Sequence, residues 1–273
     1  MNSRILEALL EQKPEEVPDR PCNNPVLYYK TRTIKAGSLT EVECYPVYQF
    51  QYRRKLEKAK VTPEAMKTVN DRIARKRFER YAEANFKKGA DFAITLTYAG
   101  YAPEEEETCN RDIRNYMKRV NRAREKAGLP RARAIGVIQR GKKGRLHTHL
   151  LIEGGLDRDM MEQLWQHGIA NCDRIQANKG GLLAIIRYMT KGFTGKRDTG
   201  RHRYYYTRNL KKPTVTESRT RISRRQAELI REDADLQGEV IMRKKYPGKL
   251  MEALEIRQTD RMPGCYIYAR MRS

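Results

Sequence analysis

Cysteine is scarce and scattered in this sequence, and markers of secreted or membrane proteins are missing. The five cysteines among 273 residues stand singly, with no CxxC pair. Neither a disulfide framework nor a zinc knuckle is therefore expected. No apolar run reaches the roughly 18 residues that a membrane span needs, and the mixed-charge start MNSRILEALLEQKPEEVPDR lacks the features of a signal peptide. We expect a soluble, cytoplasmic protein with no membrane contact.

Motifs of several common catalytic classes are also absent. The sequence has no GxxxxGK[ST] phosphate loop, so we expect no fused helicase of the P-loop kind. It has no GxSxG elbow and no cysteine beside a histidine motif, so serine or cysteine hydrolase chemistry has no support.

Acidic residues are few relative to basic ones. The chain has 57 Lys and Arg against 34 Asp and Glu, a formal net charge of +23. Two segments, 111–145 and 187–225, each hold 13 basic and two acidic residues and supply most of the excess. A polyanion is the expected partner, with nucleic acid first and a membrane surface as the rival. The alternative is that such runs are merely solvated faces.

The central part of the chain has an ordered series of periodic segments. The pattern predicts strands over 91–98, 133–139, 146–153 and 170–175, and helices over 103–126, 157–167 and 181–191. The order βαββαβ, followed by one more helix, indicates an α+β protein with a ferredoxin-like, RRM-like core around a central antiparallel sheet.

The flanks are predicted from turn and cap signals. We expect a loosely held arm over 1–25, a β-hairpin formed by 25–35 and 38–49, and a helix over 62–86. After a basic loop at 192–203, we expect a strand at RYYYTRN, a helix over 223–236 and a closing strand pair with a turn at 262–264. The expected regions are an N-terminal arm, hairpin and helix (1–88) packing on the core, the core (89–213), and a C-terminal helix and strand extension (214–273).

The stretch GRLHTHLLI places His147 and His149 on one face of a strand. A tight hairpin centred on Lys143 would set Gln139 opposite His147. Two imidazole nitrogens and an amide oxygen, with positions left open, suit Mg²⁺ or Mn²⁺ at a phosphodiester better than a closed zinc site. The alternative is that the two histidines are ordinary polar residues.

Tyr188 and Lys191 share one face of the predicted helix GGLLAIIRYMTKG, with small residues at Gly181 and Ala184. The small residues would let this helix approach the sheet. A free phenol has a pKa near 10, a handicap of roughly 4 kcal/mol for forming the phenolate at pH 7. A nearby Lys⁺ and a metal-polarised phosphate would offset much of it. Taken alone, Tyr188 is more typical of a core or interface tyrosine.

Three elements in order, ITLTY (94–98), HTHLLI (147–152) and YMTK (188–191), resemble the motifs of HUH endonucleases of the rolling-circle replication initiator type. RYYYTRNLKKP looks like the subgroup of small bacterial phages, plasmids and integrated elements. The resemblance covers residues 91–213 well.

The resemblance implies a division of roles. His147, His149 and Gln139 would hold Mg²⁺ or Mn²⁺, and Tyr188 would attack the scissile phosphate to form a 5′-phosphotyrosine link, assisted by Lys191. The implied partners are single-stranded origin DNA, which a hairpin could present, together with a helicase and a polymerase of a bacterial host, and a second protomer.

The expected DNA-binding residues come from two sources. The resemblance implies that Thr95, Thr97 and Tyr98 shape the DNA-binding face. The basic segments add Arg140, Lys142, Lys143, Arg145, Arg187, Lys196, Arg197, Arg203, Arg208, Lys211 and Lys212.

The sequence departs from the family pattern at two positions. Thr148 is less bulky than the usual residue between the histidines, but it should face away from the metal. Ala184 stands where two-tyrosine relatives carry the second tyrosine, which indicates a single-tyrosine enzyme. Completion of a round would need a second protomer, a hydroxyl attack, or a tyrosine of the triplet 204–206, for which packing and base stacking is the preferred interpretation. The remaining alternatives are an HUH transposase or relaxase, or a non-catalytic nucleic-acid-binding protein.

Overall fold

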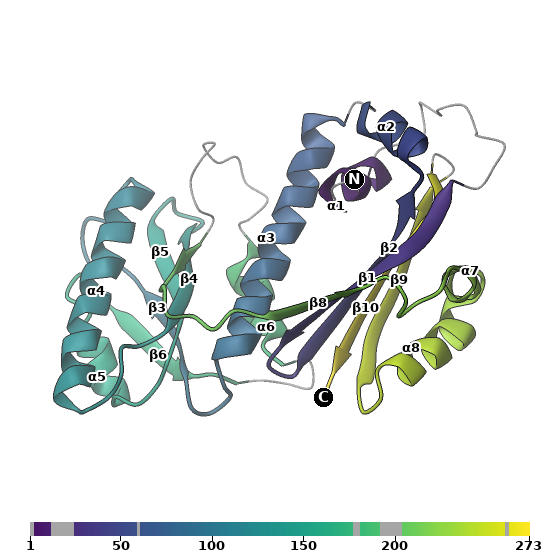
Figure 1. Cartoon of the computed structure of the whole chain (residues 1–273). Helices are drawn as coiled ribbons and strands as arrows, with labels where there is room; N and C mark the ends of the chain where they lie inside the picture. The colour runs from purple at the N-terminus through teal and green to yellow at the C-terminus, as the bar shows by residue number, and fades with distance from the viewer. Residues whose placement is uncertain (1–2, 12–24, 59–60, 177–180, 192–203, 260–261) are drawn as a thin grey trace. The chain divides into compact units, whose positions relative to one another are not determined.

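The computed structural model describes residues 3–11, 25–58, 61–176, 181–191, 204–259 and 262–273 (Figure 1). Ala74–Lys212 forms one compact unit, and Met1–Ile73 together with Pro213–Ser273 forms the other. Each unit has a five-stranded antiparallel sheet, so the chain is an α+β protein, as predicted. Within these described ranges, none of the helices combines the length and apolarity needed to cross a bilayer.

The sheet of the Ala74–Lys212 unit has the strand order β6-β3-β5-β4-β7. Helices α4 and α5 connect β3 to β4 and β5 to β6, and β4 and β5 form a hairpin. This order is that of the predicted βαββαβ core. The bounds are β3 (Phe92–Leu96), α4 (Glu106–Lys126), β4 (Ala134–Arg140), β5 (Leu146–Ile152), α5 (Arg158–Gln163), β6 (Ala170–Arg174) and β7 (Tyr205–Tyr206).

Both faces of this sheet are apolar and covered by helices. Leu150 and Ile152 of β5 share one core cluster with α4 and α5, whereas Leu151 shares another with α6 (Leu183–Met189) and the later turns of α3 (Pro63–Asn85). Figure 1 shows α4 and α5 on one side of the sheet and α6 on the other. Because side chains alternate along a strand, His147 and His149 lie on the α6 side with Leu151.

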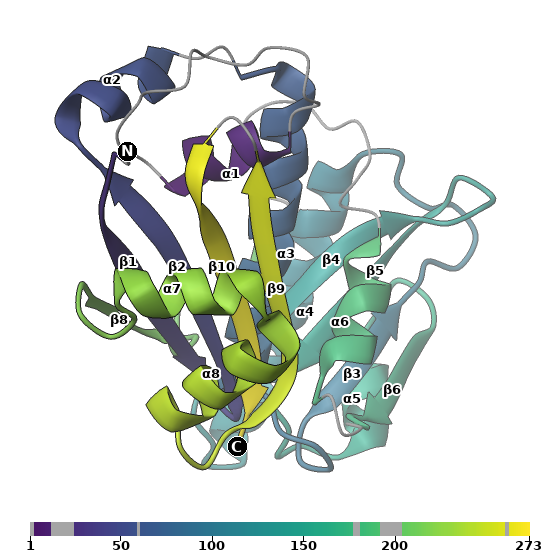
Figure 2. The same ribbon diagram turned by 90° about the vertical axis from the view of Figure 1, so that its right-hand side faces the viewer.

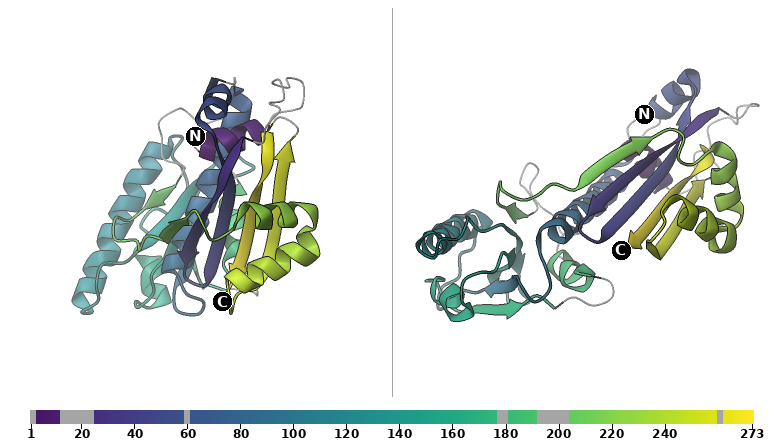
Figure 3. Two further views of the ribbon diagram at one scale, coloured as in Figure 1. Left: turned by 45° about the vertical axis from the view of Figure 1, so that its right-hand side comes forward. Right: turned by 60° about the horizontal axis from the view of Figure 1, so that its bottom comes forward.

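The other unit has the strand order β8-β1-β2-β10-β9, and its long strands lie side by side in Figure 3. β1 and β2 form the predicted hairpin, which turns at Gly37 (φ +57°) and Ser38. Helices α7 and α8 lie across one face of the sheet (Figure 2). The bounds are α1 (Ser3–Leu10), β1 (Val26–Ala36), β2 (Leu39–Tyr48), α2 (Phe50–Lys58), β8 (Thr214–Ser218), α7 (Arg224–Glu232), a π-helix (Ala234–Gly238), α8 (Glu239–Lys245), β9 (Leu250–Thr259) and β10 (Met262–Arg272).

The N-terminal segment differs from the sequence prediction. Residues 3–10 are not part of a loose arm but form α1, whose Leu6 and Leu9 are buried in the core of this unit. Their spacing of three places them on one face of a helix, and burying that face stabilises a segment too short to be helical alone. Helix α2 was not predicted, because its sequence FQYRRKLEK is mostly charged. Residues 12–24 of the expected arm lie outside the described part.

The C-terminal predictions are partly confirmed. β9 and β10 form the expected strand pair, but the predicted turn at 262–264 lies inside β10, where Gly264 (φ +86°) marks an irregular register. The helix expected over 223–236 begins as predicted, with Ser223 and Gln226 forming a capping box, but gives way to the π-helix after Glu232. The strand expected at RYYYTRN is reduced to Tyr205–Tyr206.

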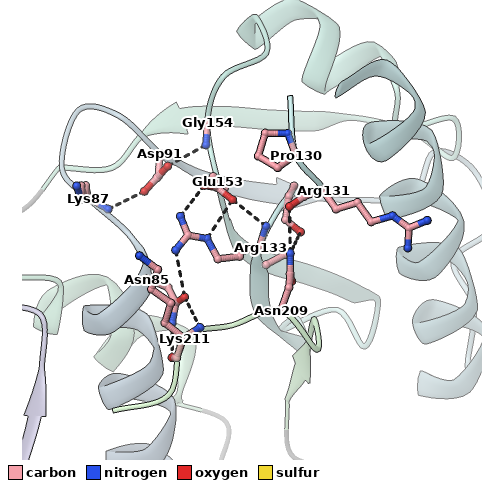
Figure 4. A network of polar contacts seen from close by, with 12 residues as sticks. Asn85, Lys87, Asp91, Pro130, Arg131, Arg133, Glu153, Gly154, Asn209 and Lys211 are labelled. Carbon is pink, nitrogen blue, oxygen red and sulfur yellow. Dashed lines mark hydrogen bonds and ion pairs between the residues drawn. The ribbon is translucent and has the colours of Figure 1, made fainter. Parts of the chain in front are cut away.

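A polar network closes the end of the Ala74–Lys212 sheet where β4 begins (Figure 4). The Arg133 guanidinium pairs with both oxygens of Glu153, at 2.5 and 3.0 Å. Asn85 at the end of α3 donates to the Lys211 carbonyl (2.9 Å) and accepts from its N–H (2.8 Å). The carboxylate of Asp91 accepts backbone N–H groups from both sides. These bonds attach the end of α3 and the segment after β7 to the sheet.

Candidate active site

The β4–β5 hairpin brings three of the predicted site residues to one end of the sheet. Gln139 is paired with His147, which confirms the predicted register. Gly144 (φ +79°) lies in the connecting turn, a conformation that favours glycine. On the other side of β5, Thr95 of β3 is paired with His149. Thr148 is buried on the opposite face, as expected.

The two imidazoles are in contact with each other. Their ring centroids lie 4.9 Å apart, with the planes perpendicular. His149 Nδ1 lies 3.1 Å from Thr95 Oγ1, whereas His149 Nε2 is buried without a hydrogen-bond partner. Burial and the neighbouring His147 lower the pKa of His149 to about 4, so this imidazole is neutral at pH 7. A buried, unpaired ring nitrogen costs about 1–3 kcal/mol, which a ligand at that atom would offset.

Tyr188 lies beside these histidines. It is on α6, whose Ile186 and Met189 are buried against the sheet, and its ring centroid is 5.2 Å from that of His149. The side chain is 61% exposed. It borders a hollow of about 490 Å³ lined by Thr95, Thr97, Tyr98, Gly141, Lys142, Lys143, Arg145, Leu146, His147, His149 and Tyr188. The phenol is therefore accessible to a large ligand from a site that also holds both imidazoles.

Gln139 contacts α6 rather than the hollow. Its amide nitrogen donates to the carbonyl oxygens of Tyr188 (3.3 Å) and Met189 (2.6 Å). The last carbonyls of a helix have no partner within the helix, so this amide satisfies two of them and fixes the end of α6 beside the hairpin. Lys191 is exposed just beyond that end.

The donor chemistry around His149 fits a divalent cation. A neutral imidazole with an orphaned Nε2, a second imidazole in contact with it and a nearby amide oxygen would supply N, N and O ligands and leave positions open. Among the described residues, no group of three or more His, Cys, Asp or Glu side chains is placed to hold a metal. A metal here would therefore depend on water or phosphate oxygens for its remaining ligands.

Two of the predicted DNA-binding arginines are engaged with the backbone. Arg145 donates to the carbonyls of Tyr98 (2.7 Å) and Gly100 (2.8 Å), and Arg140 donates to Gly144 and Glu104. Both fasten the loop after β3 to the hairpin. Lys142 and Lys143 are exposed at the tip of the hairpin and border the hollow.

The residues that follow β3 are held by contacts that the sequence did not reveal. The Tyr98 hydroxyl donates to Asp112 (3.0 Å), and its ring packs edge-on against Trp165 (5.4 Å). Burial raises the pKa of Tyr98. Thr97 Oγ1 donates to the Ile169 carbonyl. Asp112 and Trp165 come from α4 and the segment after α5, and no motif links them to Tyr98 in the sequence.

The other predicted basic residues are spread over the unit. Arg187 is exposed on α6. Arg208, Lys211 and Lys212 are exposed in the segment that adjoins the start of β4, whereas the hairpin lies at its other end, roughly 17 Å along the strand. Lys196, Arg197 and Arg203 lie outside the described residues.

Comparison with known proteins bears on the segment that contains this site. Residues 91–193 match the family model of the replication-associated protein ORF2. The match runs from β3 to just beyond α6 and includes His147, His149 and Tyr188. It supports a replication-associated function. Neither the curated proteins nor the solved structures gave a match.

Proposed function

We propose that this protein is a rolling-circle replication initiator of the HUH type, which nicks and joins single-stranded origin DNA through Tyr188. The observation that carries the proposal is the orphaned Nε2 of a neutral His149, in contact with His147 and beside the exposed phenol of Tyr188. The match to a replication-associated family favours an initiator over a transposase or a relaxase.

His147, His149 and the carbonyl oxygen of Gln139 would hold Mg²⁺ or Mn²⁺, which supplies Lewis-acid polarisation of the scissile phosphate when bound. Thr95 and Gln139 prepare the ligands for this role. If Nδ1–H of His149 donates to Thr95 Oγ1, the lone pair is on Nε2, the atom without a partner. The amide nitrogen of Gln139 is already used on α6, which leaves its oxygen for the metal.

The reaction proposed for Tyr188 is a transesterification. The phenolic oxygen forms a bond to phosphorus while the bond from phosphorus to the 3′ oxygen breaks, and the phenolic proton ends on that oxygen. The products are a 5′-phosphotyrosine and a free 3′-hydroxyl, from which a host polymerase would extend. Lys191, just beyond α6, would stabilise the phenolate or the bound phosphate. Unwinding would come from a host helicase.

Closure of the circle would need a second transfer with one tyrosine on α6. Ala184 is exposed at the position one turn before Tyr188, so this helix offers no second phenol there. Tyr205 faces the opposite core. A second protomer, or a hydroxyl attack that reverses the link, would complete the round.

The proposal is tested with labelled single strands that tile the protein's own replicon. We expect a covalent protein–DNA band with Mn²⁺ or Mg²⁺ that is lost with EDTA and in Tyr188→Phe. Tyr101→Phe, which changes another exposed tyrosine of the same unit, is the control and should retain the band. Metal-independent binding without any adduct would instead favour a non-catalytic nucleic-acid-binding protein.

A further inference from the structure

Strand β7 places tyrosines at an edge of the sheet, on the face that carries the histidines. Tyr206 is paired with Ile135, which belongs to the core cluster beneath α3 and α6. Tyr204 also packs on that cluster, whereas Tyr205 packs on the opposite one. Only β4 separates β7 from the histidine strand, so the two strands are roughly 10 Å apart.

Tyr204 and Tyr206 differ in exposure. The Tyr204 ring packs edge-on against Phe78 of α3, with centroids 5.4 Å apart, and burial raises the pKa of Tyr204 to about 12. The Tyr206 ring lies 5.8 Å from that of Tyr204 and is 41% exposed. The outer ring is thus supported by a buried one, which limits the conformational freedom that it would lose on stacking.

A cation lies beside these rings. Arg77 is exposed on α3, and its guanidinium carbon is 5.8 Å from the centroid of the Tyr81 ring. Tyr204, Tyr81 and Tyr206 together raise the pKa of Arg77, with Tyr204 the largest contributor, which places the guanidinium close to all three phenols. Aromatic rings with an adjacent fixed cation are the elements with which proteins bind single-stranded nucleic acid.

We propose that Tyr206, Arg77 and Tyr81 form a platform for single-stranded DNA, on which a nucleobase stacks against Tyr206 while Arg77 contacts a phosphate. The unit Ala74–Lys212 holds 31 basic and 15 acidic residues, so a polyanion fits it better than an apolar partner or a second copy of the chain. The platform rests on the proposed function for the identity of its strand, because the same face carries Tyr188.

The platform is tested by fluorescence anisotropy of a labelled, mixed-sequence single strand with the full chain in EDTA, so that binding is scored without nicking. We expect Tyr206→Ala to weaken binding by roughly 5- to 100-fold. Tyr206→Phe should bind like the wild type. Arg77→Ala should weaken binding and also reduce the slope of log K against log salt by about 0.7, the value for one phosphate of a single strand.

Two further variants keep the test sharp. Tyr206→Leu retains apolar bulk on the edge strand but has no aromatic face, so it should melt like the wild type and bind like Tyr206→Ala. Arg122→Ala, an exposed arginine of α4 on the other side of the sheet, should leave both affinity and slope unchanged.

Wild-type affinity in Tyr206→Ala, full affinity in Tyr206→Leu, or an unchanged salt slope in Arg77→Ala would overturn the platform. Failure of the proposed function gives a different result. In that case no fragment forms a metal-dependent adduct, while the Tyr206 and Arg77 variants still weaken binding.

Discussion

At the level of single residues, the contacts of His149 define the site. Alternation along a strand was enough to place His147 and His149 on one face and Thr148 on the other. The hairpin register then set Gln139 opposite His147. The hydrogen bond from His149 to Thr95 and those from Gln139 to the end of α6 were not foreseen, because they join strands and helices that are far apart in the sequence.

Thr95→Val is expected to weaken metal binding by about 10- to 100-fold, the usual effect of removing a group that orients a ligand histidine. Valine has the shape of threonine without the hydroxyl. The measurement is titration with Mn²⁺, together with the ¹⁵N shifts of the His149 ring in the metal-free protein. These shifts should report the Nδ1–H tautomer in the wild type and in Thr95→Ser but not in Thr95→Val. An unchanged tautomer with unchanged affinity would show that Thr95 does not orient His149.

At the level of elements, the core was predictable because its signals are local. Strand alternation, the glycines of the β4–β5 turn and the apolar spacing of α4 all lie within short windows. The structure of α1 and the shortness of β7 depend on distant neighbours: α1 is stabilised by burial of Leu6 and Leu9, and β7 pairs with β4 over two residues only. No window of the sequence contains that information.

The polar network at the start of β4 predicts a pH dependence of stability. The hydrogen bond from Arg133 lowers the pKa of Glu153 below its ordinary value of 4.5. The unfolded chain therefore takes up a proton at a higher pH than the folded one, and the stabilisation is lost as the pH falls below about 4.5. Glu153→Gln should lower the free energy of unfolding by about 1–3 kcal/mol at pH 7 and should lack this acid-dependent loss.

The fluorescence of Trp165, the single tryptophan, reports unfolding of this unit specifically. Glu228→Gln removes a carboxylate from an exposed ion pair with Arg224 in the other unit and should leave the Trp165 transition unchanged. If Glu153→Gln melted like the wild type at pH 7 and showed the same acid limb, the ion pair would not stabilise the unit.

At the level of the whole molecule, charge is unevenly divided between the two units. The Ala74–Lys212 unit has a net charge of +16 and the other unit has +7. The two basic segments of the sequence predicted the sign and the partner class. They did not predict that Arg140 and Arg145 would be engaged with backbone carbonyls, since composition does not distinguish a structural arginine from one that binds DNA.

Single-stranded DNA binding should therefore depend strongly on salt. Contacts with about six phosphates predict a slope of log K against log salt near −4. Lys142→Ala with Lys143→Ala should make the slope shallower by about 1.4, since both residues are exposed beside the hollow. Arg122→Ala serves again as the control. An affinity that does not change with salt would contradict an electrostatic interface with DNA.

The central claim is that Tyr188 forms the covalent link to DNA, and mapping the adduct tests it most directly. Trypsin cleaves after Arg187 and Lys191, so the peptide YMTK should carry the nucleotide mass when the reaction is run with Mn²⁺ and digested with nuclease and trypsin. The peptide YYYTR, which contains Tyr204 to Tyr206, should be unmodified. A nucleotide on YYYTR, or a protein that binds origin DNA with metal present yet yields no modified peptide, would contradict the account.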